Sequence, residues 1–323
     1  MNNQRDSYYD VIKGIAIIMV IGIHTFTNDN YNISLYVRPY LNCAVPIFLA
    51  LSGFFIGSKP LKTREAYASF LIKQIKRVYV PMLIWSIPWI CMEIENGIMR
   101  KSSLLLLWVI GGLDIMYFVT LIIQFYILTP VFQRITKSLL SLIILTLLTL
   151  SSVHLINNYV HENSLVFSLG LAPFWLVFYY LGVVQAQGKM FRLRMSILLV
   201  LILISIVCIG IETYISLRYS VNQGYKSSTH IFSIFVIILV FHPSVKKCFQ
   251  KIDKQPFVKM LSLVGRWSFF LYLTHCLSLH LIYPDFFLNV WPIDWFVVSV
   301  LALFFCYMTS KIIPQKCHRY IGF

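Results

Sequence analysis

Long apolar runs separated by short polar stretches extend along almost the whole chain of 323 residues. Most of these runs reach or approach the roughly 20 residues that a helix needs to cross the hydrocarbon core of a bilayer. We therefore expect an all-α, polytopic membrane bundle of about ten transmembrane helices. The predicted spans are residues 10–27, 40–58, 70–95, 115–133, 138–156, 165–186, 195–216, 229–244, 259–283 and 292–313. A further apolar stretch, 104–113, is too short to cross and is expected at the interface or as a re-entrant segment.

The composition agrees with a membrane protein. Hydrophobic residues make up 59% of the chain, charged residues only 12%, and the mean hydropathy is +0.77, whereas soluble domains average about 25% charged residues. No break in composition marks a second, soluble domain, so residues 1–323 are expected to form a single transmembrane domain. The first run is expected to be a retained span, because no small-residue cleavage site follows it and further spans do.

The distribution of charge predicts the topology. The net charge is +15, but the basic residues alternate between loops in register with the spans and form no single face, so we exclude nucleic acid as a partner. With the N-terminus in the cytoplasm, 21 of the 27 Lys and Arg residues fall on the inner side, five on the outer side, and Arg266 inside a span. This distribution satisfies the positive-inside rule. It predicts that both termini are cytoplasmic in a multi-pass protein of the plasma or inner membrane.

Two ionisable residues, Lys13 and His24, frame the first apolar run. Ionisable groups at membrane depth are costly and usually face a protein interior or a watery cavity. Eleven residues are close to three helical turns, so the two side chains share a face and lie roughly 16 Å apart along the axis. Imidazole suits a general base for a hydroxyl nucleophile. The alternatives are a snorkelling anchor for Lys13 and an interfacial histidine for His24.

Further basic residues are candidates for binding phosphate groups at the cytoplasmic side. Lys73 and Arg77 are four residues apart on one helix face, with Lys76 between them. Such a set could hold the phosphates of a nucleotide-bearing donor, or it could face anionic lipid. Arg266, inside a span, needs a partner or an anionic ligand.

Other polar side chains in the spans could support a site or serve only packing. His275 lies nine residues after Arg266 and is a further candidate for the site. The alternative is a purely structural role for His275. The remaining candidates for substrate contact or support are Ser52, Tyr117, Glu212 and Tyr272. The seven cysteines are scattered without a Cys-x-x-Cys pair, and no other ligand type clusters with His154 and His161, so we assign no metal.

Several motifs occur in order along the chain, and together they resemble the acyltransferase 3 family of integral membrane acyltransferases. The motifs are Asp10-x-x-Lys-Gly-Ile-Ala leading to His24, Val45-Pro-Ile-Phe through Ser52-Gly-Phe, Lys73 to Pro81, Tyr117-Phe-Val with Tyr126 and Pro130, Phe178-Tyr-Tyr-Leu-Gly182, and Ser268 to His275.

The resemblance implies transfer of an acyl group, usually acetyl, from cytoplasmic acyl-CoA to an acceptor at the outer face. Family acceptors include surface polysaccharides and lipid-linked glycans. The family's catalytic histidine falls on His24, and its basic residue before the proline falls on Arg77. Its first-helix arginine falls on Lys13, which keeps the charge but loses the bidentate fork.

Acetyl-CoA is therefore the expected co-substrate, with its phosphates near Lys13, Lys73, Lys76, Arg77 and Arg266 and its thioester near His24. A membrane carrier or exporter of a glycan or amino acid, without chemistry, is the alternative. A carrier often contains inverted repeats and broken helices, and no clear repeat is visible in the sequence. A catalytically inactive scaffold is a third hypothesis.

Overall fold

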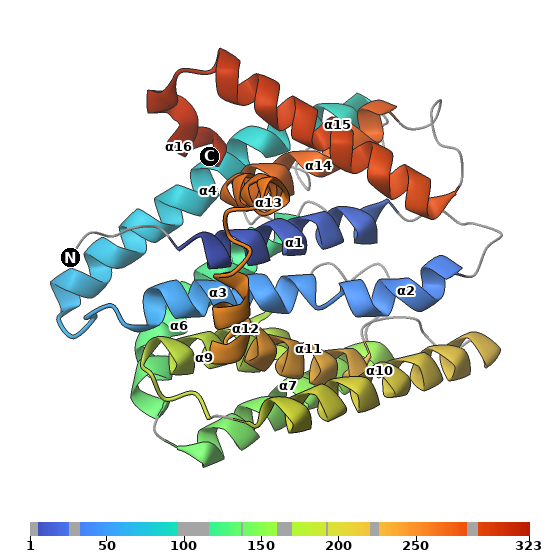
Figure 1. Ribbon diagram of the computed structural model, residues 1–323. Helices are drawn as coiled ribbons and strands as arrows, with labels where there is room; N and C mark the ends of the chain where they lie inside the picture. The colour runs from blue at the N-terminus through green and yellow to red at the C-terminus, as the bar shows by residue number, and fades with distance from the viewer. Residues whose placement is uncertain are drawn as a thin grey trace.

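The computed structural model describes residues 6–25, 33–95, 116–136, 138–159, 170–191, 193–219, 226–282 and 290–323. Within these ranges every regular element is a helix (Figure 1). The α-helices are α1 (Ser7–His24), α2 (Ile33–Leu41), α3 (Ala44–Gly57), α4 (Arg64–Glu95), α6 (Tyr117–Ile135), α7 (Leu139–Tyr159), α9 (Leu176–Ala186), α10 (Met195–Arg218), α11 (Ser227–Val240), α12 (Pro243–Phe249), α13 (Pro256–Arg266), α14 (Ser268–Ile282), α15 (Trp291–Ile312) and α16 (His318–Ile321). Two short 3₁₀ helices are η3 (Ala172–Trp175) and η4 (Gln315–Cys317).

Six helical segments of the described chain are long and apolar enough to cross a membrane. They are Ser7–His24, Ser34–Gly57, Tyr117–Ile135, Leu139–Ile156, Met195–Arg218 and Trp291–Ile312. The pair α11 and α12, bent by 60°, would make a seventh if it forms one broken span. The all-α expectation is thus confirmed for the described residues, whereas the count of ten spans stays a prediction.

The other predicted spans also fall on helices, but not on single long apolar ones. Residues 70–95 belong to α4, which is 32 residues long and contains Pro81 and Pro88. The described part of the predicted span 259–283, residues 259–282, is divided between α13 and α14, with the break at Trp267. Residues 165–186 end in η3 and the short α9, and the stretch 104–113 lies outside the described residues.

Helix α1 runs through the middle of the bundle, between α3 on one side and α13 and α14 on the other (Figure 1). Near the start of α1, the ring of Tyr9 lies 4.8 Å from that of Phe54, near the end of α3. Near the end of α1, Ile23 packs with Leu41, just before α3 begins. The two helices are therefore antiparallel, and the end of α3 lies beside the start of α1.

Glycines allow the close crossing of α1 and α13. A Cβ added to Gly265 would lie 1.6 Å from the Asp10 carbonyl oxygen, and one added to Gly14 would lie 2.3 Å from that of Leu261. The helix backbones touch here, which is the usual function of small residues at membrane helix contacts. The same arrangement joins α3 and α9 at Gly53 and Gly182.

Helices α7 and α10 lie together at one edge of the bundle (Figure 1). Many of their large apolar side chains are exposed, among them Leu147, Leu203 and Ile204 at 54 to 62%. An exposed apolar face of this extent is unfavourable in water but suited to lipid tails. These helices therefore form a lipid-facing side of a membrane protein.

Candidate active site

The last turns of α1 are fixed against α15 by two tryptophans. Trp291 donates its indole N–H to the Gly22 carbonyl at 3.1 Å, and Trp295 donates to the Ile18 carbonyl at 2.8 Å. A Cβ added to Gly22 would lie 2.5 Å from the Trp295 ring, so this position has room only for glycine. The two rings stack on each other at 5.2 Å. They hold in place the helix end that carries His24.

The structure brings His24 together with His275 of α14. The ring centroids are 5.2 Å apart, at an interplanar angle of 55°. His24 keeps part of its surface open, whereas His275 is 0% exposed. The two histidines are 251 residues apart in sequence, and they meet because the chain turns at Trp267 and α14 then runs to the end of α1. The pair is accessible on one side and packed on the other.

Backbone contacts define the tautomer of His275. Its Nδ1 lies 3.0 Å from the Leu271 carbonyl and 2.9 Å from that of Tyr272. A carbonyl oxygen can only accept, so in the neutral ring Nδ1 carries the hydrogen and Nε2 is an acceptor. This Nε2 is buried and has no hydrogen-bond partner among the described residues. A buried polar atom in this condition is costly, and it is available to a group brought by a neighbour or a ligand.

The thiol of Cys276 lies at the same place and adds a third atom that could act as a metal ligand. Its Sγ and one ring nitrogen from each of His24 and His275 all lie within 4.8 Å of one another. Cys276 is buried, at 4% exposed.

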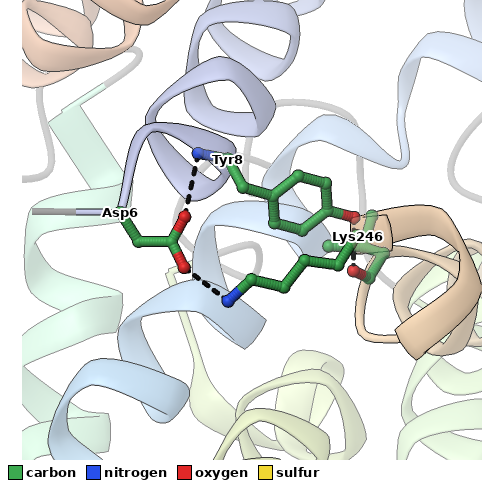
Figure 2. A network of polar contacts seen from close by, with 4 residues as sticks. Asp6, Tyr8 and Lys246 are labelled. Atoms are coloured by element: carbon green, nitrogen blue, oxygen red, sulfur yellow. Dashed lines mark hydrogen bonds and ion pairs between the residues drawn. The ribbon is translucent and has the colours of Figure 1, made fainter. Parts of the chain in front are cut away.

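The start of α1 is tied to the α11–α12 junction, as Figure 2 shows. Asp6 caps α1 by accepting from the Tyr8 amide at 3.1 Å, and it pairs with Lys246 at 2.5 Å. The Tyr8 hydroxyl donates to the Val240 carbonyl at 2.6 Å. These contacts fix the end of α1 that is remote from His24.

A cleft opens beside this end of α1. Its volume is about 380 Å³, and it lies between the first turns of α1 and helix α13. The lining includes two cations, Lys259 and Arg266, and two carboxylates, Asp10 and Asp253. The Arg266 side chain is exposed and lines this cleft. An anionic ligand that enters the cleft could therefore bind to it.

Lys13 lies near the same cleft but is already paired. Its Nζ is 2.6 Å from Asp10 Oδ1, one turn earlier on α1, and 5.6 Å from the centre of the Phe55 ring. The side chains are 19% and 5% exposed. The Lys13 ammonium therefore neutralises a buried carboxylate. The alternative of a snorkelling anchor did not predict this pairing.

The basic residues of α4 lie near Lys59, just after α3. Burial, together with the positive charges of Lys73 and Arg77, lowers the pKa of the Lys59 amine from its usual value. Lys73, Lys76 and Arg77 are all exposed. Because the end of α3 lies beside the start of α1, this basic group and the cleft with Arg266 occupy the same end of the bundle. No motif in the sequence singled out Lys59 as a member of this group.

The four supporting candidates have different surroundings. Tyr272 lies 6.3 Å from the His275 ring and 5.5 Å from Phe118, on α6. Tyr117 is half-buried at the start of α6, and Ser52 is half-buried on α3 beside the α3–α9 crossing. Glu212 accepts from the backbone amide of Ser228 at 3.2 Å and from its hydroxyl. Its described contacts belong to the α10–α11 junction, where it holds the first turn of α11.

Comparison with known proteins identifies the family. A family model described as an acyltransferase domain, Acyl_transf_3, matches residues 6–311, nearly the whole chain. The chain belongs to the acyltransferase 3 family. The resemblance carried by the sequence motifs is thereby confirmed.

One curated relative is the nodulation protein NolL of Sinorhizobium fredii (strain NBRC 101917 / NGR234). It is 29% identical over 89 residues, which cover 26% of this chain and 24% of the relative. The match thus spans about a quarter of the relative's length. No solved structure matches the chain.

The described geometry gives this acyltransferase two chemically distinct ends. One end of α1 carries an accessible imidazole backed by a buried one, and the other end lies among exposed cations. Sequence reasoning named both histidines but missed Cys276, Trp291 and Trp295. The four-residue spacing of the tryptophans was the available signal, because it places both indoles on one helix face.

Proposed function

We propose that this membrane acyltransferase moves an acetyl group from cytoplasmic acetyl-CoA to a hydroxyl of an extracytoplasmic surface polysaccharide or lipid-linked glycan. The observation that supports this most directly is the histidine pair His24–His275 at one end of α1, with exposed cations at the other. Lys13 and His24 lie roughly 16 Å apart along the helix. An extended pantetheine arm can span such a distance, so the phosphates would bind at one end while the thioester meets the histidine pair.

The donor phosphates are assigned to Lys73, Lys76, Arg77 and Arg266, whereas the charge of Lys13 is balanced by Asp10. Phosphate oxygens form strong charge-assisted hydrogen bonds with such groups. We assign the basic end to the cytoplasm on the basis of the positive-inside pattern of the sequence. This topology puts His24 toward the outer face of the plasma or inner membrane, where a glycan acceptor would approach it.

His24 is the proposed general base. A small rotation of its ring lets one nitrogen donate to Nε2 of His275, which leaves the other nitrogen as the proton acceptor. That nitrogen takes the proton from the acceptor hydroxyl, and the hydroxyl oxygen attacks the thioester carbonyl. The C–S bond then breaks, and the imidazolium returns the proton to the departing thiolate. The products are the O-acetylated acceptor and free CoA.

A carrier without chemistry fits the chain less well than an enzyme does. Carriers often contain inverted repeats and broken helices, and no clear repeat is visible in the sequence. An inactive scaffold does not need the histidine pair. We therefore favour the enzyme.

The decisive experiment compares surface glycans by mass spectrometry in cells with and without the gene. The expected difference is one acetyl group per modified sugar. Re-expression of the wild-type protein should restore the acetylation. His24→Ala should not restore it, because loss of a general base costs about 10²–10⁴-fold in rate. His154→Ala, at an exposed histidine of α7, is the matched control and should behave as wild type. Normal acetylation with His24→Ala, or no glycan difference in the null strain, would contradict the proposal.

A further inference from the structure

His24, His275 and Cys276 together have the composition of a transition-metal site. Two imidazoles and one thiol converge with their donor atoms within 4.8 Å of one another. Nitrogen and sulfur donors without a carboxylate favour zinc over magnesium or calcium, which prefer oxygen ligands. We propose that these three side chains bind a Zn²⁺ ion, and that the bound ion blocks the acyltransferase.

The spacing of the donor atoms is close to what zinc requires. Zinc binds nitrogen at about 2.0–2.1 Å and thiolate sulfur at about 2.3 Å in tetrahedral geometry, so its ligands lie roughly 3.3–3.8 Å apart. The three donors need to approach one another by about an ångström from the 4.8 Å limit. His24 can supply the part of this movement that brings the ligand atoms of α1 and α14 together, because it is the partly open member of the group.

His275 is already arranged as a metal ligand. Metal-binding histidines almost always donate their second ring N–H to a carbonyl or carboxylate, which fixes the ring and its tautomer. Here Nδ1 donates to the Leu271 and Tyr272 carbonyls, at 3.0 and 2.9 Å. The remaining nitrogen, Nε2, is buried without a hydrogen-bond partner among the described residues. Coordination would satisfy this nitrogen without any change at Nδ1.

The consequence for activity rests on the proposed function. A neutral imidazole has a single lone-pair nitrogen, so a His24 ring that binds zinc carries its hydrogen on the other nitrogen and cannot accept a proton. The ion also occupies the Nε2 of His275 that would orient the His24 ring. Binding also releases the Cys276 proton, because the thiolate is the ligand. Zinc and catalysis therefore compete for the same two imidazole rings, and zinc should act as a reversible inhibitor.

Metal binding is measured first, without reference to activity. The full-length protein is purified through a tag without histidine, placed in lipid nanodiscs and stripped with a chelator. Zinc affinity is then determined by competition with a chromophoric chelator, and Co²⁺ is used as a spectroscopic probe of thiolate ligation. We expect one tight equivalent of zinc and a sulfur-to-cobalt charge-transfer band.

Two cysteine variants assign the ligand. Cys276→Ala should weaken zinc binding by roughly tenfold or more, since even the loss of an outer-sphere partner costs about 10–100-fold, and it should abolish the cobalt band. Cys306→Ala, at another buried cysteine, is the matched control and should bind as wild type. Size-exclusion profiles and thermal unfolding verify that both variants fold. A wild-type protein that binds no zinc, or a Cys276→Ala variant that binds it unchanged, would overturn the site.

Inhibition is measured separately, as each variant's rate with zinc relative to its own rate after chelation. Wild type and Cys306→Ala should lose most of their activity with zinc and regain it with chelator, and Cys276→Ala should lose much less. Zinc that binds the wild type and leaves acyl transfer unaffected would overturn the blocking role. A protein that transfers acyl groups but binds no zinc would refute this inference and leave the proposed function intact.

Discussion

The two nitrogens of His275 perform different tasks. Nδ1 is held by the carbonyls of Leu271 and Tyr272, so the ring cannot turn away from α1 without losing both hydrogen bonds. Nε2 is buried without a hydrogen-bond partner among the described residues, in a ring whose centroid lies 5.2 Å from that of His24. In the proposed mechanism His275 touches neither substrate nor donor but acts through His24, as a positioning residue.

Two substitutions of His275 separate positioning from packing. His275→Phe keeps a ring of similar size and removes the acceptor, whereas His275→Gln keeps an acceptor oxygen. We expect kcat to fall by about 10–100-fold in the Phe variant, a loss smaller than that of the base itself, and KM for acetyl-CoA to stay unchanged. The Gln variant should recover part of kcat. These constants are measured on purified protein in nanodiscs.

A purely structural role would give another result. The Phe and Gln variants would then differ mainly in thermal stability, and kcat per folded molecule would be the same in both. That outcome would remove His275 from the mechanism.

At the scale of helices, the site depends on how closely α1 and α13 cross. Gly14 and Gly265 let the two backbones touch, and the chain then turns at Trp267 to send α14 along α1 toward His24. On the opposite side, the indoles of Trp291 and Trp295 bond to the last turns of α1. The relative position of the histidines therefore depends on a glycine crossing ten residues before each of them and on indole contacts two and six residues before His24.

This crossing gives a prediction about stability. Gly265→Ala places a Cβ 1.6 Å from the Asp10 carbonyl oxygen, so α1 and α13 must separate. Overpacking of this kind typically costs about 1–3 kcal/mol, and thermal unfolding in nanodiscs should show a clearly lower Tm together with reduced acyl transfer. The control is Gly210→Ala on the lipid-facing α10, where the nearest atom is the Tyr40 hydroxyl at 3.6 Å. Equal stability of the two variants would contradict the close crossing.

The extent of sequence-based prediction also differs between helices. The apolar runs that became α1, α6, α7, α10 and α15 were predicted within a few residues, because a long apolar segment has few alternatives to a helix in lipid. The break at Trp267 was not predicted, since residues 259–283 contain no proline to mark it. His24 and His275 were identified as separate candidates. Their contact depends on tertiary packing between helices, because the two residues are 251 positions apart in the sequence. Local periodicity carries no information about such a contact.

At the scale of the whole molecule, the candidate site has a polarity along α1. Asp6, Asp10 and Lys13 lie at the start of the helix, near the cleft that Arg266 lines, and His24 lies at its end. The antiparallel arrangement of α1 and α3 adds Lys59 and the exposed Lys73 and Arg77 to the first end. A donor with an anionic head and a reactive tail would be bound in one orientation by this arrangement. Binding and chemistry should therefore be separable by mutation.

Arg77 offers the clearest separation of the two. A hydrogen bond to a charged group is worth about 1.5–3 kcal/mol, and each 1.4 kcal/mol corresponds to about tenfold in affinity. Arg77→Ala should therefore raise KM for acetyl-CoA by roughly tenfold, while kcat at saturating donor stays within about twofold, because the lost interaction is the same in the ground and transition states. Arg77→Lys should give an intermediate KM, since it retains charge without the planar fork. The matched control is Lys62→Ala, an exposed cation just before α4, which should leave both constants unchanged. A fall in kcat with unchanged KM would place Arg77 in the chemical step, and equal effects of Arg77→Ala and Lys62→Ala would reduce the basic end to a contact with anionic lipid.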